Sequence, residues 1–236
     1  MISRGPASPA AARLERSSTV TAVSATDRPV SQPSTARRLG VLISGRGSNL
    51  QALIGAIERG ELDARIVVVI SNRADAGGLD LARSAGIETL AISHRDFATR
   101  DDFDARLAQE LRDRQVGLVC LAGFMRLVGA QLLDAFPNAV LNIHPSLLPA
   151  FPGVDAQHPA LRHGVKVTGA TVHLVTGELD AGPIVVQAWV PVLDSDTIAT
   201  LSARILVEEH RIYPQAVAMV LGGRWRVDGR RFTITD

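Results

Sequence analysis

The feature that most constrains the fold is the regular alternation of apolar runs with amphipathic segments between residues 37 and 144. The runs rich in Val, Ile and Leu are predicted strands, at residues 39–44, 65–71, 88–93, 117–123 and 139–144. Segments with apolar residues at helical spacing separate them, at residues 48–60, 76–86, 100–115 and 127–136. Strands that are apolar on both faces are typical of a parallel sheet covered by helices on both sides. We therefore expect a doubly wound α/β fold that binds ligands at the carboxyl ends of its strands.

The pattern changes after residue 165. Residues 166–175 and 182–192 are predicted strands joined by a turn-forming sequence, which indicates an antiparallel pair added to the mostly parallel sheet. A helix is expected at about residues 197–221, and the dipeptide Asp228-Gly229 predicts a short hairpin. No internal repeat is visible, so residues 37–236 are predicted to form one domain.

Residues 1–36 differ in composition from the rest of the chain. They are rich in Ser, Thr, Ala, Pro and Arg and contain no aromatic residue, so we expect a disordered N-terminal extension. The segment lacks the apolar region of a signal peptide. Its Arg and Ser content loosely resembles an organellar transit peptide, and a start codon placed too early is an alternative origin.

Bulk properties exclude several classes of protein. A formal net charge of +1 gives no reason to expect nucleic acid as a partner. No apolar stretch approaches the roughly 18 to 20 residues of a membrane span. The single cysteine, Cys120, lies in an apolar run and is expected to be a buried thiol in a reducing compartment. We expect a soluble, cytoplasmic protein.

The sequence ISGRGSNLQAL places two glycines and a serine between the first strand and the first helix. Glycines let the backbone approach a ligand, and a helix N-terminus offers unpaired N–H groups to an anion. We predict a phosphate held by the amides of Gly47, Ser48 and Asn49 and by the Ser48 hydroxyl. A dinucleotide fingerprint fails because residue 50 is Leu and the second strand has no acidic residue at its end. The alternative is a tight turn in which Ser48 only caps the helix.

The fifth predicted strand, in AVLNIHPSLLPAFPG, ends in polar residues and is followed by a proline-rich loop. Asn142 and His144 are two apart, so both side chains point to the same side of a strand. Histidine can move a proton near neutral pH, and an amide can donate to an oxygen that becomes negative during acyl transfer. The alternative is a hydrogen-bonded structural histidine. No Gly-x-Ser-x-Gly elbow surrounds Ser146 and no close metal-ligand set is present, so neither a serine nucleophile nor a metal is predicted.

A group that orients the imidazole is also needed. Asp180, in TGELDAGP, is the candidate, although most aspartates in such sequences only make turns. Sequence spacing alone does not show that Asp180 reaches His144.

These segments resemble the phosphoribosylglycinamide formyltransferase family, the folate-dependent enzymes of purine synthesis. The resemblance extends over about residues 39–222 and includes VISNRADAGGLDLARSAGI, LAGFMRLV, VTGATVHLV and ELDAGPIVVQA. Its most specific elements are the SGxGSN loop, the NxHPSLLPxxPG strand end and the ELDxGP turn. It implies transfer of the formyl group of 10-formyltetrahydrofolate to the amino group of glycinamide ribonucleotide, by His-assisted acyl transfer through a tetrahedral intermediate.

The resemblance implies a role for each matching residue. His144 transfers protons, Asn142 stabilises the oxyanion, and Asp180 pairs with His144 and raises its pKa. Glu209 contacts the ribonucleotide, whose phosphate the glycine loop holds. The folate is expected against Arg100, Met125, Arg126, Leu127, Val128, Asn142, Thr176, Gly177, Glu178, Leu179 and Asp180. Arg100 and Glu209 could equally be solvated helix charges, and Asp155, where some relatives have a histidine, is given no role.

Three rival interpretations stay open at this point. A formyltetrahydrofolate deformylase shares the Asn, His and Asp set but resembles a fusion with an N-terminal regulatory domain. A methionyl-tRNA formyltransferase adds a C-terminal domain and lacks the SGxGSN loop. A non-catalytic nucleotide-sugar binder would use the loop alone. We expect small-molecule substrates, no membrane or nucleic-acid partner, and a monomer or homodimer.

Overall fold

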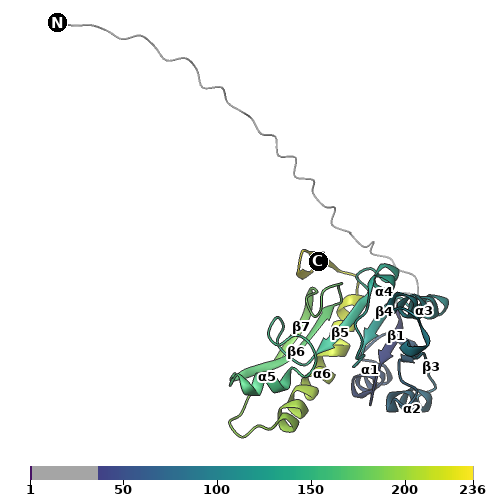
Figure 1. Cartoon of the computed structure of the whole chain (residues 1–236), viewed down its shortest axis with the longest axis horizontal. Helices are drawn as coiled ribbons and strands as arrows, with labels where there is room; N and C mark the ends of the chain where they lie inside the picture. The colour runs from purple at the N-terminus through teal and green to yellow at the C-terminus, as the bar shows by residue number, and fades with distance from the viewer. Residues whose placement is uncertain (2–36, 236) are drawn as a thin grey trace.

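A computed structural model describes residue 1 and residues 37–235 and confirms the expected fold class. The expectation of a disordered extension over residues 1–36 falls on a segment almost wholly outside the described residues. Within the described part, one nine-stranded sheet has the order β3-β2-β1-β4-β5-β6-β7-β9-β8 (Figure 1). Its strands are β1 (Arg38–Ile43), β2 (Arg65–Ser71), β3 (Thr89–Ala91), β4 (Leu118–Leu121), β5 (Val140–His144), β6 (Val167–Leu174), β7 (Ile184–Pro191), β8 (Trp225–Asp228) and β9 (Arg231–Ile234).

The sheet changes from parallel to antiparallel at β5. Strands β1 to β5 pair in parallel, and β5 then pairs antiparallel with β6, and β6 with β7, as the sequence predicted. The predicted hairpin forms β8 and β9. Because β1 lies between β2 and β4, the chain reverses its winding direction there. Such a switch point leaves a crevice at the carboxyl ends of β1 and β4, where ligands of open α/β sheets bind.

Helices cover both faces of the sheet. α1 and α6 pack together on one face, and α3 and α4 pack together on the other (Figure 1). The helices are α1 (Ser48–Glu58), α2 (Gly77–Ser84), the short 3-10 helix η2 (His94–Asp96), α3 (Arg100–Asp113), α4 (Ala130–Ala135), α5 (Gln157–Arg162) and α6 (Ile198–Leu221). The helix expected at 127–136 is shorter because its first residues belong to the loop after β4. α5 was not predicted, since six residues including Pro159 carry too little periodicity.

Helix α6 contacts two central strands of the sheet through Tyr213. Its Tyr213 is fully buried, and the phenol donates to the carbonyl oxygens of Leu121 at 2.9 Å and Leu141 at 3.3 Å. Leu121 ends β4 and Leu141 is the second residue of β5, so one hydroxyl contacts two neighbouring strands of the sheet. Beside it, Cys120 is a buried free cysteine as expected, and burial raises the pKa of its thiol to about 12.

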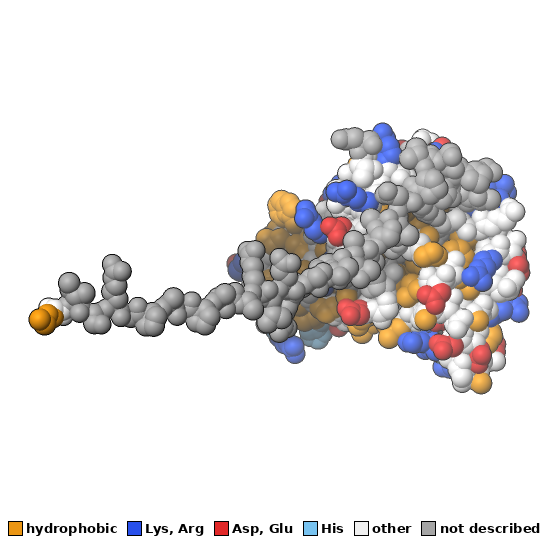
Figure 2. All heavy atoms as spheres, turned by 90° about the horizontal axis from the view of Figure 1, so that it is seen from above, with side chains coloured by type: hydrophobic (Ala, Val, Ile, Leu, Met, Phe, Trp, Pro, Cys, Tyr) orange, Lys and Arg blue, Asp and Glu red, His pale blue; other side chains and the backbone are white. Residues whose placement is uncertain are grey.

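Acidic and basic side chains are interspersed on the face that Figure 2 shows, as expected for a body of nearly neutral charge. Among the residues that the structure describes, no helix combines the length and the apolarity needed to cross a membrane.

Candidate active site

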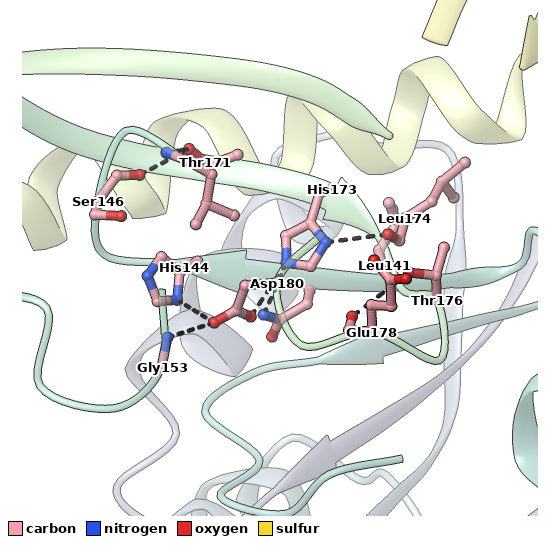
Figure 3. Close-up of polar contacts among 12 residues, drawn as sticks. Leu141, His144, Ser146, Gly153, Thr171, His173, Leu174, Thr176, Glu178 and Asp180 are labelled. Atoms are coloured by element: carbon pink, nitrogen blue, oxygen red, sulfur yellow. Dashed lines mark hydrogen bonds and ion pairs between the residues drawn. The ribbon is translucent and has the colours of Figure 1, made fainter. Parts of the chain in front are cut away.

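His144 and Asp180 meet at the carboxyl end of β5. His144 is only 4% exposed. Its Nδ1 lies 3.5 Å from Asp180 Oδ2 (Figure 3), and its Nε2 lies 2.8 Å from the Phe151 carbonyl oxygen. Both ring nitrogens therefore face oxygen acceptors, and the imidazolium form satisfies both contacts. The structure thus supplies the contact between His144 and Asp180 that sequence spacing could not show.

The turn between β6 and β7 brings Asp180 to this position. A Cβ atom on Gly182 would lie 1.8 Å from the Leu174 carbonyl oxygen, so the turn packs against the end of β6 at a distance that only glycine permits. Asp180 has a left-handed backbone with φ 49°, and its Oδ2 accepts the Gly153 N–H at 2.7 Å. The carboxylate is therefore fixed between the sheet and the proline loop.

His173 completes the polar cluster and was missed by the sequence analysis. The register of β5 and β6 pairs Asn142 with His173, and Asn142 Nδ2 lies 3.2 Å from His173 Nε2. His173 Nδ1 lies 3.0 Å from the Leu174 carbonyl oxygen, which can only accept, so Nδ1 carries a proton. His173 Nε2 is also 3.7 Å from Asp180 Oδ1. The orientation of the Asn142 amide is therefore set by its neighbour on β6.

Burial and charge oppose each other at His144. Burial lowers the pKa of His144 below its ordinary value of 6.5, while the Phe151 carbonyl and the Asp180 charge act to raise it. The Asp180 charge by itself acts to raise this pKa, as expected, but the net shift is downward because burial has the larger effect. Burial acts to raise the pKa of Asp180, but its contacts with His173 and Gly153 outweigh burial and lower it, so the carboxyl is ionised at neutral pH.

The glycine loop ends at the start of α1. Gly47 is left-handed with φ 80°, and no side chain caps the helix. The interpretation of Ser48 as a simple cap is therefore wrong. A Cβ atom on Gly47 would lie 2.8 Å from the Gly78 Cα, so the loop packs against the start of α2, where the Gly78 N–H donates to the Gly45 carbonyl. The first N–H groups of α1 stay available to an anion.

Helix α6 reaches the same loop through Glu209. This carboxyl is buried, and its Oε2 accepts from Asn49 Nδ2 at 2.6 Å. Burial raises the pKa of Glu209, and the hydrogen bond from Asn49 opposes that shift. The alternative of a solvated helix charge is therefore wrong for Glu209. The contact also fixes Asn49 at the edge of the predicted phosphate site.

Most of the residues expected to contact folate are exposed or half-buried. Met125 is 67% exposed, Leu127 55% and Leu179 54%. Arg126 is half-buried, Val128 is buried, and Thr176, Gly177 and Glu178 are exposed. Exposed apolar side chains can pack against a flat aromatic ring system. Arg100 is exposed at the start of α3, so for this residue the solvated alternative stays open.

Two hollows lie outside this cluster. One of about 540 Å³ is at the opposite end of the sheet, lined by Arg38, Arg65 and Arg114 among others, and contains none of the predicted site residues. Another of about 350 Å³ borders Thr176 and Gly177, at the side of the expected folate surface. In the described part of the chain, no three His, Cys, Asp or Glu side chains come together as metal ligands.

Gly47→Ala is expected to lower the free energy of unfolding by about 1–3 kcal/mol, because it places a side chain at positive φ and against Gly78. Thermal or urea unfolding measures the change. Gly45→Ala is the matched control, since a Cβ there meets no atom within 4 Å, and its stability should stay within about 0.5 kcal/mol of the parent. Equal stability of the two variants would show that the glycine loop does not need the observed packing.

The fold and the site together define a class of protein, a doubly wound α/β protein with a buried histidine–carboxylate contact at the carboxyl end of a central strand. The formyl transferase family matches residues 37–217, so the chain belongs to that family. Its relatives of similar length place it among the phosphoribosylglycinamide formyltransferases. The Escherichia coli phosphoribosylglycinamide formyltransferase is 42% identical over 190 residues, covering 80% of this chain and 87% of that protein.

A solved structure of glycinamide ribonucleotide transformylase 1 from Symbiobacterium toebii is 53% identical, with a TM-score of 0.84, over 89% of this chain and all of that one. The human trifunctional purine biosynthetic protein adenosine-3 is 47% identical over 79% of this chain, which spans only 18% of that protein. A formyltetrahydrofolate deformylase from Pseudomonas syringae pv. tomato is more distant, with 29% identity and a TM-score of 0.78, over 85% of this chain and 66% of that one.

Proposed function

We propose that the chain transfers the formyl group of 10-formyltetrahydrofolate to the amino group of glycinamide ribonucleotide, a step of purine synthesis. The observation that carries the proposal is the contact between His144 and Asp180 at the end of β5. This acid–base pair lies at the same edge of the sheet as the glycine loop after β1. An acyl-transfer cluster and an anion site are what a phosphorylated amine substrate requires.

Each residue of the cluster has a separate role in acyl transfer. The substrate amine forms a bond to the formyl carbon, and the bond from that carbon to the folate nitrogen breaks. The amine nitrogen loses one proton, and the folate nitrogen gains one. His144 moves this proton, Asn142 donates to the oxyanion of the tetrahedral intermediate, and Asp180 holds the imidazole. Because Nε2 contacts the Phe151 carbonyl, it has to exchange that partner for a substrate group first.

Binding residues position the two substrates. The amides of Gly47, Ser48 and Asn49 and the Ser48 hydroxyl hold the phosphate, and Glu209 lies beside them through Asn49. The folate lies against Arg100, Met125, Arg126, Leu127, Val128, Asn142, Thr176, Gly177, Glu178, Leu179 and Asp180. Holding two reactants in one orientation supplies much of the acceleration, since effective molarities can reach about 10⁵ M or more.

A second candidate is hydrolysis of the formyl donor, which the likeness to a deformylase favours. Water would then take the place of the amine at the same cluster. The transferase is the better supported of the two, because a deformylase has no use for a phosphate loop beside the catalytic residues. A cytoplasmic location and a monomeric or homodimeric state complete the proposal, and the single buried cysteine fits a reducing compartment.

The deciding experiment measures folate release from 10-formyltetrahydrofolate by absorbance, with and without glycinamide ribonucleotide. We expect release only when the ribonucleotide is present, with one formylated product formed per folate released. Equal release in its absence, with formate as the product, would show the deformylase instead.

A further inference from the structure

The loop between β4 and α4 is held at both ends by buried side chains. At one end the Met125 N–H donates to Ser44 Oγ at 2.8 Å, and Ser44 in turn donates to Asn72 Oδ1 at 2.6 Å. At the other end the Gly129 N–H donates to Asp104 Oδ2 at 2.7 Å. Met125 and Leu127 project from the loop between these anchors. A short loop pinned at both ends presents its middle residues in one arrangement.

Asp104 is an unusual residue for its place in α3. Its neighbours on the apolar face, Phe103, Leu107 and Leu111, are buried core residues, and Asp104 itself is only 1% exposed. Its Oδ1 has no hydrogen-bond partner among the described residues. Burying an incompletely paired carboxyl costs stability, so an apolar residue would serve the core better. The hydrogen bond that the Asp104 carboxyl accepts from the Gly129 amide therefore accounts for an acidic residue at this buried position.

Gly129 shows how tightly this anchor is packed. Its φ of −102° is open to any residue, so backbone conformation does not require glycine there. A Cβ atom at this position would lie 2.7 Å from Asp104 Oδ2 and 3.3 Å from Arg100 Nε. The guanidinium of Arg100, the end of the loop and the Asp104 carboxyl therefore pack together.

We propose that Asp104 is a positioning residue for the formyl-folate subsite. Through the Gly129 amide it fixes the loop of residues 125–128, and its negative charge lies near the positive charges of Arg100 and Arg126. It does not touch the substrate. The inference rests on the proposed function and adds to it the residue that holds the folate surface in place.

The test compares Asp104→Ala with Asp104→Asn. The alanine variant removes the acceptor for Gly129 and should raise the KM for 10-formyltetrahydrofolate about tenfold, with kcat and the KM for glycinamide ribonucleotide within about threefold of the parent. The asparagine variant keeps a carbonyl acceptor and should largely restore this KM. Asp113→Asn, the same charge change at the exposed far end of α3, is the matched control and should change nothing. An unchanged folate KM in Asp104→Ala, or an equal rise in both KM values, would overturn the proposal.

Gly129→Ala provides an independent variant if Asp104→Ala does not fold. It keeps the carboxyl but pushes it away from the loop, and it should raise the folate KM selectively as well. A normal folate KM in Gly129→Ala would contradict the proposal.

Calorimetry with the analogue 10-formyl-5,8-dideazafolate distinguishes a failure of the proposed function from a failure of the positioning role. No binding by the parent protein would remove the proposed function. Binding by the parent that is equally tight in Asp104→Ala and in Gly129→Ala would remove only the positioning role. We expect weaker binding in both variants.

Discussion

Asp180→Asn is expected to lower kcat by about two to four orders of magnitude without disturbing the fold. The substitution removes the negative charge 3.5 Å from His144 Nδ1 that favours the protonated imidazole during proton transfer. Asparagine tolerates the left-handed backbone at φ 49°, and its carbonyl oxygen can still accept the Gly153 N–H. Steady-state kinetics measures the loss, and thermal unfolding checks that the protein is folded.

Asp155→Asn is the matched control for this variant. Asp155 has the same left-handed backbone, with φ 59°, and pairs with His158 at the surface, outside the cluster. Its kcat should stay within about twofold of the parent. Near-normal turnover in Asp180→Asn would remove that carboxylate from the mechanism.

The pH profile supplies a second readout of the same substitution. Activity that needs neutral His144 is present above its folded-state pKa and is lost as pH falls through that value. Because burial holds the pKa below 6.5, the acid limb of the parent should lie below pH 6.5. The Asp180 charge acts to raise this pKa, so the limb of Asp180→Asn should move to still lower pH. A shift to higher pH would contradict the assignment.

Asn142→Ala is expected to lower kcat by about 10²- to 10³-fold with little change in either KM. The amide is aligned by His173 at 3.2 Å and donates most strongly to an oxygen that carries negative charge, which exists only after attack on the formyl carbon. Rapid-quench or steady-state kinetics at saturating substrates measures the loss.

Asn142→Asp separates donation from packing. It keeps the shape of the side chain but replaces the donor with a negative charge, so it should be at least as damaging as alanine. Near-parent activity in Asn142→Asp, or a change confined to KM, would show that Asn142 only fills space or binds the ground state.

The fold was predictable because its main determinant is local. Strands buried on both faces must be apolar throughout, and the helices between them must have an apolar stripe. The alternation of strands and helices can therefore be predicted from the pattern of apolar residues. The short elements were harder to predict. α5 has too few residues for a period, and the loop after β4 contains Leu127 and Val128, which continue the apolar spacing of α4 without being helical.

The site was predictable in its residue types but not in its contacts. The place of Asp180 depends on Gly182 packing against Leu174, and that of His173 on the register between β5 and β6. Both are long-range features that spacing along the chain does not encode. A signal for His173 existed, since TVHLV puts a polar residue into an apolar strand.

Glu209 carried a clearer signal that could have been used. It lies four residues after Ile205 and three before Ile212, so helical spacing already placed it on the buried face of α6. A carboxyl on an apolar stripe calls for a specific partner, which the structure shows to be Asn49.

The cluster residues and the helix α6 that supports them are synthesised at different times. The cluster residues lie between residues 142 and 180, whereas Tyr213, which contacts β4 and β5, and Glu209, which accepts from Asn49, are translated later. A nascent chain therefore carries its acid–base residues before it carries the helix that supports them. The cluster therefore reaches the arrangement described here only after α6 has been synthesised and has packed against α1 and the sheet.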